Sequence, residues 1–96
     1  MCGWSVYILR CSDNSLYTGI ATDVSRRMRE HEAGKSGAKY LRGRTPITLM
    51  FQQEVGDRSR ASRVEHYLKR LPKSEKERFV SSPALCRAYI ETLTDT

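Results

Sequence analysis

Five side chains of this 96-residue chain could combine in a single reaction. They are Tyr7, Tyr17, Arg27, His31 and Glu65. An arginine stabilises the negative charge that develops on phosphate oxygens during phosphodiester hydrolysis, because its planar guanidinium donates paired, charge-assisted hydrogen bonds. A carboxylate can hold a divalent cation that keeps several waters and activates one of them. These residue types therefore suit the hydrolysis of a phosphodiester.

The hydrolysis also needs a group that accepts the proton of the attacking water, and two side chains compete for this role. A tyrosine such as Tyr7 has a pKa near 10, so it is a poor base unless neighbouring cations favour the phenolate. His31, with an ordinary pKa near 6.5, is the rival base. Glu65 is the one carboxylate that the pattern aims inward, which favours one metal ion over two.

Each of these residues also has a purely structural interpretation. A strand tyrosine or an inner-face histidine commonly packs in a core, and Gly19 can simply end a strand. Arg27 could form a structural ion pair with Glu65. The functional interpretation therefore depends on the whole set and not on any one member.

The tyrosines belong to two short strands that should form a hairpin. Residues 4–9 and 16–20 are rich in aromatic and β-branched types, and a turn cluster at residues 12–15 separates them. Alternation along the first strand places Tyr7 on one face of the sheet and Val6 on the other.

A helix should follow the hairpin, capped by Thr22 or Asp23 and closed by Gly34. Its spacing places Arg27 and His31 on the face that meets the sheet. Further on we expect a third strand at residues 47–55, and then a helix that Pro72 stops, with Glu65 at the margin of its apolar side. Arg26, Arg29 and Glu30 should point away from the sheet.

A short helix from residue 73 and a C-terminal helix at about 83–93 complete the chain. The order β-β-α-β-α-α, followed by the C-terminal helix, predicts an α+β fold, a small three-stranded antiparallel sheet flanked by helices. We expect residues 1–96 to form a single domain with its core at about 4–80.

The net charge of +6 is concentrated in the middle of the chain. The predicted loop at residues 34–46 carries four basic residues, one tyrosine and no acidic residue. Such a loop suits a polyanionic partner, although a merely solvated basic surface is the alternative. The candidate nucleic-acid contacts are Lys35, Lys39, Tyr40, Arg42 and Arg44.

Other features favour a cytoplasmic protein without a membrane segment. No apolar run approaches the ~20 residues of a membrane span, and the N-terminus lacks the pattern of a signal peptide. Cys2, Cys11 and Cys86 match no zinc spacing, so we interpret them as free thiols in a reducing compartment.

With these residues in place, the sequence resembles the GIY-YIG nuclease superfamily, which is named for two short motifs in adjacent strands. The motifs correspond here to Ser5-Val6-Tyr7 and Tyr17-Thr18-Gly19, and Arg27 lies eight residues after Gly19. The resemblance covers about residues 4–80 and is closest to the stand-alone, single-domain, YhbQ-like bacterial branch. That branch shares the Leu68-Lys69-Arg70-Leu71 stretch.

The resemblance implies a role for each matching residue. Glu65 would ligate one Mg²⁺ or Mn²⁺ ion, and Arg27 would hold the scissile phosphate. Tyr7 would act as the base or orient the water, and Tyr17 would position the phosphate or the water beside it. His31 would assist as a proton shuttle or hydrogen-bond partner.

Three positions depart from the family pattern. Ser5 replaces the first glycine of the first motif, and Thr18 replaces the central isoleucine of the second. Gly19 is kept and would allow close backbone approach. Many members carry an asparagine after the glutamate helix, whereas no asparagine follows Asn14 here. This last departure bears on cleavage efficiency more than on fold.

The resemblance implies a metal-dependent endonuclease that hydrolyses phosphodiester bonds in DNA, structure-selective and not sequence-specific, in DNA repair or processing. The alternative is a non-catalytic or weakly active nucleic-acid-binding domain with the same fold. A structural or partner-binding protein with a solvated basic surface is the third interpretation. The sequence does not distinguish DNA from RNA.

Overall fold

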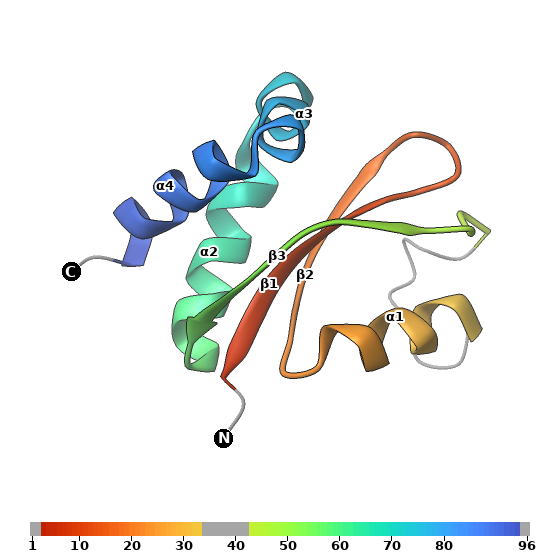
Figure 1. Ribbon diagram of the computed structural model, residues 1–96, viewed down its shortest axis with the longest axis horizontal. Coiled ribbons are helices and arrows are strands. Elements are labelled where there is room, and N and C mark those ends of the chain that lie inside the picture. Colours follow the sequence, from red (N-terminus) through yellow and green to blue (C-terminus); the bar gives the residue numbers. More distant parts are fainter. Residues whose placement is uncertain (1–2, 34–42, 95–96) are drawn as a thin grey trace.

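The computed structural model describes residues 3–33 and 43–94 and has an α+β fold, as predicted (Figure 1). A three-stranded antiparallel sheet lies between one helix and a group of three helices. The strands and helices are β1 (Trp4–Arg10), β2 (Leu16–Ala21), α1 (Val24–Ala33), β3 (Thr48–Gly56), α2 (Arg58–Arg70), α3 (Lys73–Ser81) and α4 (Pro83–Thr94).

The strand order β2-β1-β3 places β1 in the centre of the sheet. The register between β1 and β2 sets Tyr7 opposite Gly19 and Leu9 opposite Tyr17. Directly opposed residues of an antiparallel pair share a face, so both tyrosines lie on the same side of the sheet. The predicted hairpin is therefore confirmed, and its register brings the two motif tyrosines together.

Each face of the sheet has its own core. On one face, Tyr7 and Leu9 pack with Val24 of α1. On the other face, Val6 and Ile8 pack against the helices that follow β3, with Val64 and Leu68 of α2 fully buried. Figure 1 shows α1 on one side of the sheet and α2, α3 and α4 on the other. The alternation predicted for the first strand is confirmed.

Local chemistry explains where the two functional helices begin. The carboxylate of Asp23 accepts a hydrogen bond from the backbone N–H of Arg26, and that of Asp57 accepts one from Arg60. Each aspartate satisfies a backbone donor in the first turn of its helix, which has no partner within the helix. Of the two predicted caps for α1, Asp23 and not Thr22 forms this bond.

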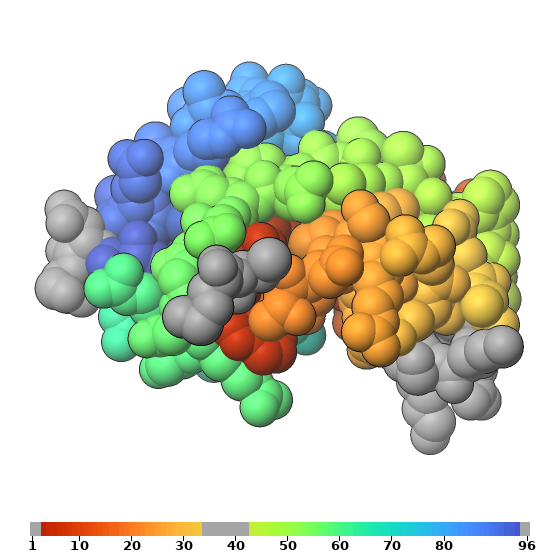
Figure 2. All heavy atoms as spheres, turned by 60° about the horizontal axis from the view of Figure 1, so that its bottom comes forward, coloured from red at the N-terminus to blue at the C-terminus, as the bar shows by residue number. Residues whose placement is uncertain are grey.

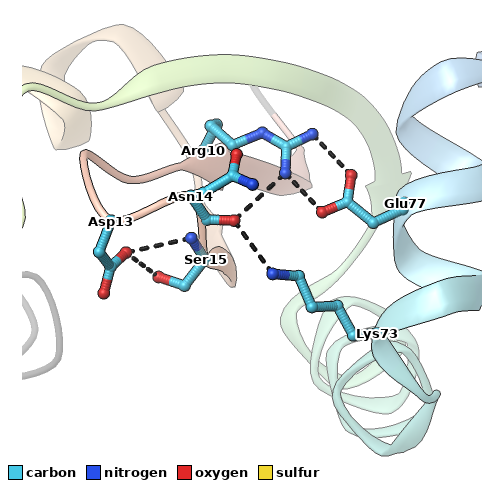
Figure 3. A network of polar contacts seen from close by, with 6 residues as sticks. All are labelled: Arg10, Asp13, Asn14, Ser15, Lys73 and Glu77. Carbon is cyan, nitrogen blue, oxygen red and sulfur yellow. Dashed lines mark hydrogen bonds and ion pairs between the residues drawn. The ribbon is translucent and has the colours of Figure 1, made fainter.

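The turn between β1 and β2 is attached to α3 by a network of polar contacts (Figure 3). Asn14 closes a three-residue turn in the left-handed conformation, with φ of 70°, which asparagine tolerates. Its carbonyl accepts hydrogen bonds from Arg10 and Lys73. Arg10 also forms a bidentate ion pair with Glu77 of α3. These contacts fix α3 against the hairpin end that lies away from the start of β1.

Some expectations fall on residues outside the described ranges, namely the end of the first helix at Gly34 and the thiol of Cys2. Cys11 and Cys86 are free and buried. Among residues 3–33 and 43–94, no helix has the length and apolar character needed to cross a membrane.

Candidate active site

Tyr7 is the centre of a small polar cluster beneath α1. Its side chain is 1% exposed, and its hydroxyl lies 3.0 Å from Nε2 of His31 in a buried hydrogen bond. His31 is 3% exposed and comes from the last turn of α1. The sheet and the helix thus bring together two groups that can exchange a proton.

Gly19 makes room for the Tyr7 hydroxyl. A Cβ atom on Gly19 would lie 2.5 Å from Oη of Tyr7 and 2.6 Å from its Cζ, well inside van der Waals contact. The sequence predicted close backbone approach at this glycine. In the structure the group that approaches it is the motif tyrosine of the neighbouring strand.

We predict that Gly19→Ala displaces the Tyr7 ring and breaks its hydrogen bond to His31. Overpacking of this kind destabilises a fold by about 1–3 kcal/mol, because the ring cannot shift without disturbing the core of β1. Urea unfolding measures this loss, and a nuclease assay measures the accompanying loss of activity.

A double-mutant cycle separates the clash from a general effect of alanine in β2. In a Tyr7→Leu background, Gly19→Ala should change the unfolding free energy much less than in the wild type. An equal loss in both backgrounds would show that Tyr7 is not the cause.

Tyr17 completes a triangle of rings with Tyr7 and His31. The ring centroids of the two tyrosines are 6.3 Å apart, and those of Tyr17 and His31 are 5.9 Å apart. Tyr17 is half-buried, on the edge strand β2, and Nζ of Lys69 lies 5.9 Å from its ring centroid. Tyr17 therefore lies between the buried Tyr7–His31 pair and the surface.

Arg27 approaches the same cluster from α1. Its guanidinium forms an ion pair with Glu30 at 3.2 Å. Burial raises the pKa of Tyr7 most, and the nearby Arg27 guanidinium acts in the opposite direction, because its positive charge and its N–H donors favour the phenolate. The structural alternative that we considered, an ion pair of Arg27 with Glu65, is therefore not the arrangement found, because a nearer carboxylate on its own helix takes that place.

Glu65 comes from α2, on the opposite side of the edge strand from α1. Its side chain is 24% exposed and pairs with Lys69 at 3.3 Å, one helical turn away. Its charge raises the pKa of both Tyr7 and Tyr17, although it is not the largest cause in either case. The carboxylate thus belongs to the electrostatic surroundings of the tyrosine pair.

Glu65 is the candidate residue for holding a divalent cation, and its side chain offers a single carboxylate. Within the described ranges, no three His, Cys, Asp or Glu side chains gather closely enough to hold a metal. Zinc sites use three or four protein ligands, whereas Mg²⁺ commonly binds to one or two carboxylates and keeps several waters. Lys69 is half exposed, so its ion pair with Glu65 is weak enough to yield to a divalent cation.

The pKa values separate the two candidate bases. Burial, and then the neighbouring Tyr17, raise the pKa of Tyr7 to about 12, against the opposing influence of Arg27. Burial, and then the positive charge of Arg27, lower the pKa of His31 below its ordinary value. At neutral pH, Tyr7 is therefore a protonated phenol and His31 a neutral imidazole that can accept a proton.

Four of the five predicted contacts with nucleic acid lie outside the described ranges. These are Lys35, Lys39, Tyr40 and Arg42. The fifth, Arg44, forms an ion pair with Asp13 in the turn after β1, and its carbonyl accepts a hydrogen bond from the N–H of Ser12. Arg44 is thus fastened to the hairpin turn, and its role toward nucleic acid stays a prediction.

The structure also has a groove that the sequence pattern did not predict. It has a volume of about 410 Å³ and lies between the start of β1, the connection from β2 to α1 and the first turn of α2. We call it the Trp4 groove, and its charged and aromatic lining is Trp4, Asp23, Arg26, Arg27, Glu30 and Arg58. The sole tryptophan, at the start of the first strand, was the one sequence signal. Helical spacing had placed Arg26 and Glu30 on the face that points away from the sheet, and both line this groove.

The sheet and its cluster define a class of protein, an α+β domain in which tyrosines of paired strands meet an arginine of the next helix. The chain belongs to the GIY-YIG family, whose catalytic domain matches residues 3–78. This membership supports an endonuclease-type role on nucleic acid, and nucleases of this family generally depend on a divalent metal.

Relatives and solved structures place the chain among small proteins of this family. It is 50% identical over 93 residues to the UPF0213 protein YhbQ of Salmonella typhimurium, covering 97% of this chain and 92% of the relative. It is 53% identical, over the same shares, to a UPF0213 protein of Citrobacter koseri.

Two solution NMR structures resemble the fold. A UPF0213 protein of Bacillus halodurans matches with a TM-score of 0.53 and 46% identity, covering 81% of this chain and 82% of that one. A protein of E. faecalis matches with a TM-score of 0.57 and 34% identity, covering 84% and 85%.

Proposed function

We propose that this protein is a metal-dependent endonuclease that hydrolyses phosphodiester bonds in DNA, selects its substrates by structure and acts in DNA repair or processing. The observation that carries the proposal is the buried hydrogen bond between Tyr7 and His31, with the Arg27 guanidinium beside it. A binding surface has no need of a buried proton acceptor next to a cation, whereas hydrolysis of a phosphodiester needs both.

In this proposal a proton moves along the Tyr7–His31 hydrogen bond. Tyr7 accepts a proton from the attacking water while its own hydroxyl proton passes to Nε2 of His31. The relay avoids a free phenolate, which a pKa of about 12 disfavours at neutral pH. Buried His31, neutral before the reaction, becomes the acceptor of that proton.

Arg27 and Tyr17 would bind and position the phosphate. Arg27 donates hydrogen bonds to the oxygens that gain negative charge as water attacks, which stabilises the transition state more than the ground state. Tyr17, half-buried at the edge of the sheet, positions the phosphate or the water over the Tyr7 hydroxyl. Arg27 comes from α1 and Tyr17 from β2, and the packing of the core fixes where these two elements lie.

Glu65 would hold one Mg²⁺ or Mn²⁺ ion. When bound, such an ion supplies Lewis-acid stabilisation of charge on the phosphate and leaving oxygens. Lys69 would exchange Glu65 for solvent as the ion binds, since its side chain is already half exposed.

Selection by shape follows from the kind of contact that a basic surface makes. Contacts to phosphates give affinity that depends on salt and carries no sequence information. The arginines near the site and the predicted basic loop would therefore bind the phosphates of the DNA backbone. The enzyme would distinguish flaps, branches or single strands by their geometry.

A nuclease assay tests the proposed function. Purified protein is incubated with single-stranded, duplex and branched DNA in the presence of Mg²⁺, Mn²⁺ or EDTA, and the products are resolved on a denaturing gel. Cleavage that requires the metal and favours one DNA structure supports the proposal. DNA binding without any cleavage in either metal would instead show a non-catalytic binding domain.

The proton relay predicts a specific pH profile. Because the pKa of His31 is lowered, cleavage should be flat near neutral pH and should fall as the pH drops through that value, where protonated His31 can no longer accept a proton. His31→Gln should lower the cleavage rate by about 10²–10⁴-fold, the usual contribution of a general base, and should remove the acidic limb.

His66→Gln is the matched control, because His66 is an exposed histidine on α2. It should leave both the rate and the profile unchanged. If Tyr7 worked as a free phenolate, cleavage would instead rise about tenfold per pH unit through the alkaline range toward a pKa near 12, and this slope would vanish in Tyr7→Phe. That result would overturn the relay.

A further inference from the structure

The Trp4 groove opens at the end of the molecule where β1 and α2 begin. Figure 2 shows this end, with atoms from the start of β1 in red between the green atoms of the β3–α2 region and the orange atoms that lead from β2 into α1. The groove has a volume of about 410 Å³ and borders the polar cluster through Arg27, which lines both.

The groove contains an aromatic platform with a cation above it. The guanidinium carbon of Arg58 lies 5.4 Å from the centroid of the Trp4 ring, the geometry of a cation–π contact. Trp4 is half-buried and Arg58 is exposed, so the arginine side chain can move without disturbing the core. A flat ligand can therefore enter between the indole and the guanidinium and be held by both.

The charges in the groove favour an anionic ligand. Arg26 and Arg27 share one carboxylate, Glu30, at 3.5 Å and 3.2 Å. The carboxylate of Asp23 caps α1, where it accepts the N–H of Arg26. Both acidic groups of the groove therefore have partners already, and the groove's three arginines outnumber them.

The groove also lies at a suitable distance from the reacting groups. Trp4 precedes Tyr7 by three residues in β1, about 10 Å along a strand, and its side chain lines the same groove as Arg27. A nucleotide with its base on Trp4 would thus be a near neighbour of a phosphate held by Arg27. A ligand with a flat apolar ring and an adjacent phosphate matches both parts of the groove.

We propose that the Trp4 groove binds an unpaired nucleotide beside the scissile phosphate, with its base stacked on Trp4 and its phosphate on Arg26. The inference rests on the proposed function, because it adds a subsite to the same reaction. Stacking on an aromatic side chain requires a base whose face is exposed, and a base within a duplex already has both faces covered. The groove thereby favours single-stranded segments, including the unpaired arm of a flap.

The protein contains one tryptophan and five tyrosines, so fluorescence excited at wavelengths where tyrosine does not absorb reports on Trp4 in this groove. The experiment titrates the protein in EDTA, where it cannot cleave, with a short single-stranded oligonucleotide and with the corresponding duplex. Stacking should quench the fluorescence in a saturable manner with the single strand and much less with the duplex. Anisotropy of labelled oligonucleotides gives both affinities independently.

Variants distinguish stacking from simple charge. Trp4→Ala should weaken single-strand binding about tenfold, within the range found for base stacking, and should leave duplex binding nearly unchanged. Arg58→Ala, which retains the fluorescent group and cannot disturb the core, should lower the same single-strand preference. Arg63→Ala removes an exposed arginine of α2 that lies outside the groove and should leave the ratio of the two affinities unchanged.

Two outcomes would overturn the inference. One is saturating single-strand binding with no change in Trp4 fluorescence. The other is a preference for single strands that Arg58→Ala and a folded Trp4→Ala both leave intact. Because the titrations are made in EDTA, they remain decisive even if the protein never cleaves DNA. Conversely, cleavage that is lost in Glu65→Gln but insensitive to Trp4→Ala would support the proposed function and reject the subsite.

Discussion

Arg27→Ala is expected to lower the rate of metal-dependent cleavage by about 10³-fold, within the range found when one preorganised donor to a developing oxyanion is removed. Arg27 pairs with Glu30 of its own helix and lies near enough to Tyr7 to act on its pKa, so its guanidinium is positioned before the substrate arrives. A preorganised cation does not have to reorganise as charge develops, and this is why its loss should affect the rate more than binding. Single-turnover cleavage of the best DNA substrate measures the effect.

Arg29→Ala is the matched control for this prediction. Arg29 lies on the same helix and is exposed, so the Arg29→Ala variant removes the same charge from α1 without changing the cluster. Its cleavage rate should stay close to that of the wild type at moderate salt. Equal losses in the two variants would mean that Arg27 contributes only through the general basic character of α1. Arg27→Lys should remain strongly impaired, because an ammonium cannot donate the paired hydrogen bonds of a guanidinium.

Glu65→Gln is expected to lower the cleavage rate by about 10³-fold or more. DNA binding should be kept or become tighter. A metal ion stabilises the charge of the transition state by several kcal/mol, and each loss of about 1.4 kcal/mol lowers the cleavage rate tenfold. The gain in binding follows from the removal of a negative charge next to the phosphate path. Binding is measured in EDTA and cleavage over a range of Mn²⁺ and Mg²⁺ concentrations.

The matched control for the glutamate is Glu75→Gln. Glu75 also forms an ion pair within its own helix, with Arg78, but lies on α3 away from the tyrosines. It should cleave like the wild type at every metal concentration. If Glu65→Gln cuts DNA with an unchanged metal dependence, Glu65 is not the metal ligand. A partial rescue at high Mn²⁺ would instead fit an amide oxygen that binds the ion weakly.

Features set by local chemistry could be predicted from the sequence. The alternation in β1 separated Tyr7 from Val6, and the short turn set Tyr7 beside Tyr17, because side chains of a strand alternate and a hairpin turn limits the register. Helical spacing placed Arg27 and His31 on the inner face of α1, and both are half-buried or buried there. The resemblance to the GIY-YIG superfamily rested on these same positions, and the family match confirms it.

The partners of long side chains could not be predicted in this way. Arg27 pairs with Glu30, which helical spacing had placed on the outward face of α1, and not with Glu65, the partner that the sequence suggested. An arginine side chain has many rotamers, so the nearest carboxylate depends on the angle at which α1 crosses the sheet. The sequence also left the base undecided between Tyr7 and His31, and burial separates their pKa values in opposite directions.

The sequence by itself determined which residues share a face and which helix carries each charged group, since backbone periodicity and capping act over a few residues. Only the tertiary structure decided that the Tyr7 hydroxyl fills the space above Gly19 and reaches His31. It also brought Trp4 against Arg58, which lie more than fifty residues apart in the chain. Such contacts depend on how two helices dock on opposite faces of one sheet, and that docking is a property of the whole core, which no local pattern in the sequence encodes.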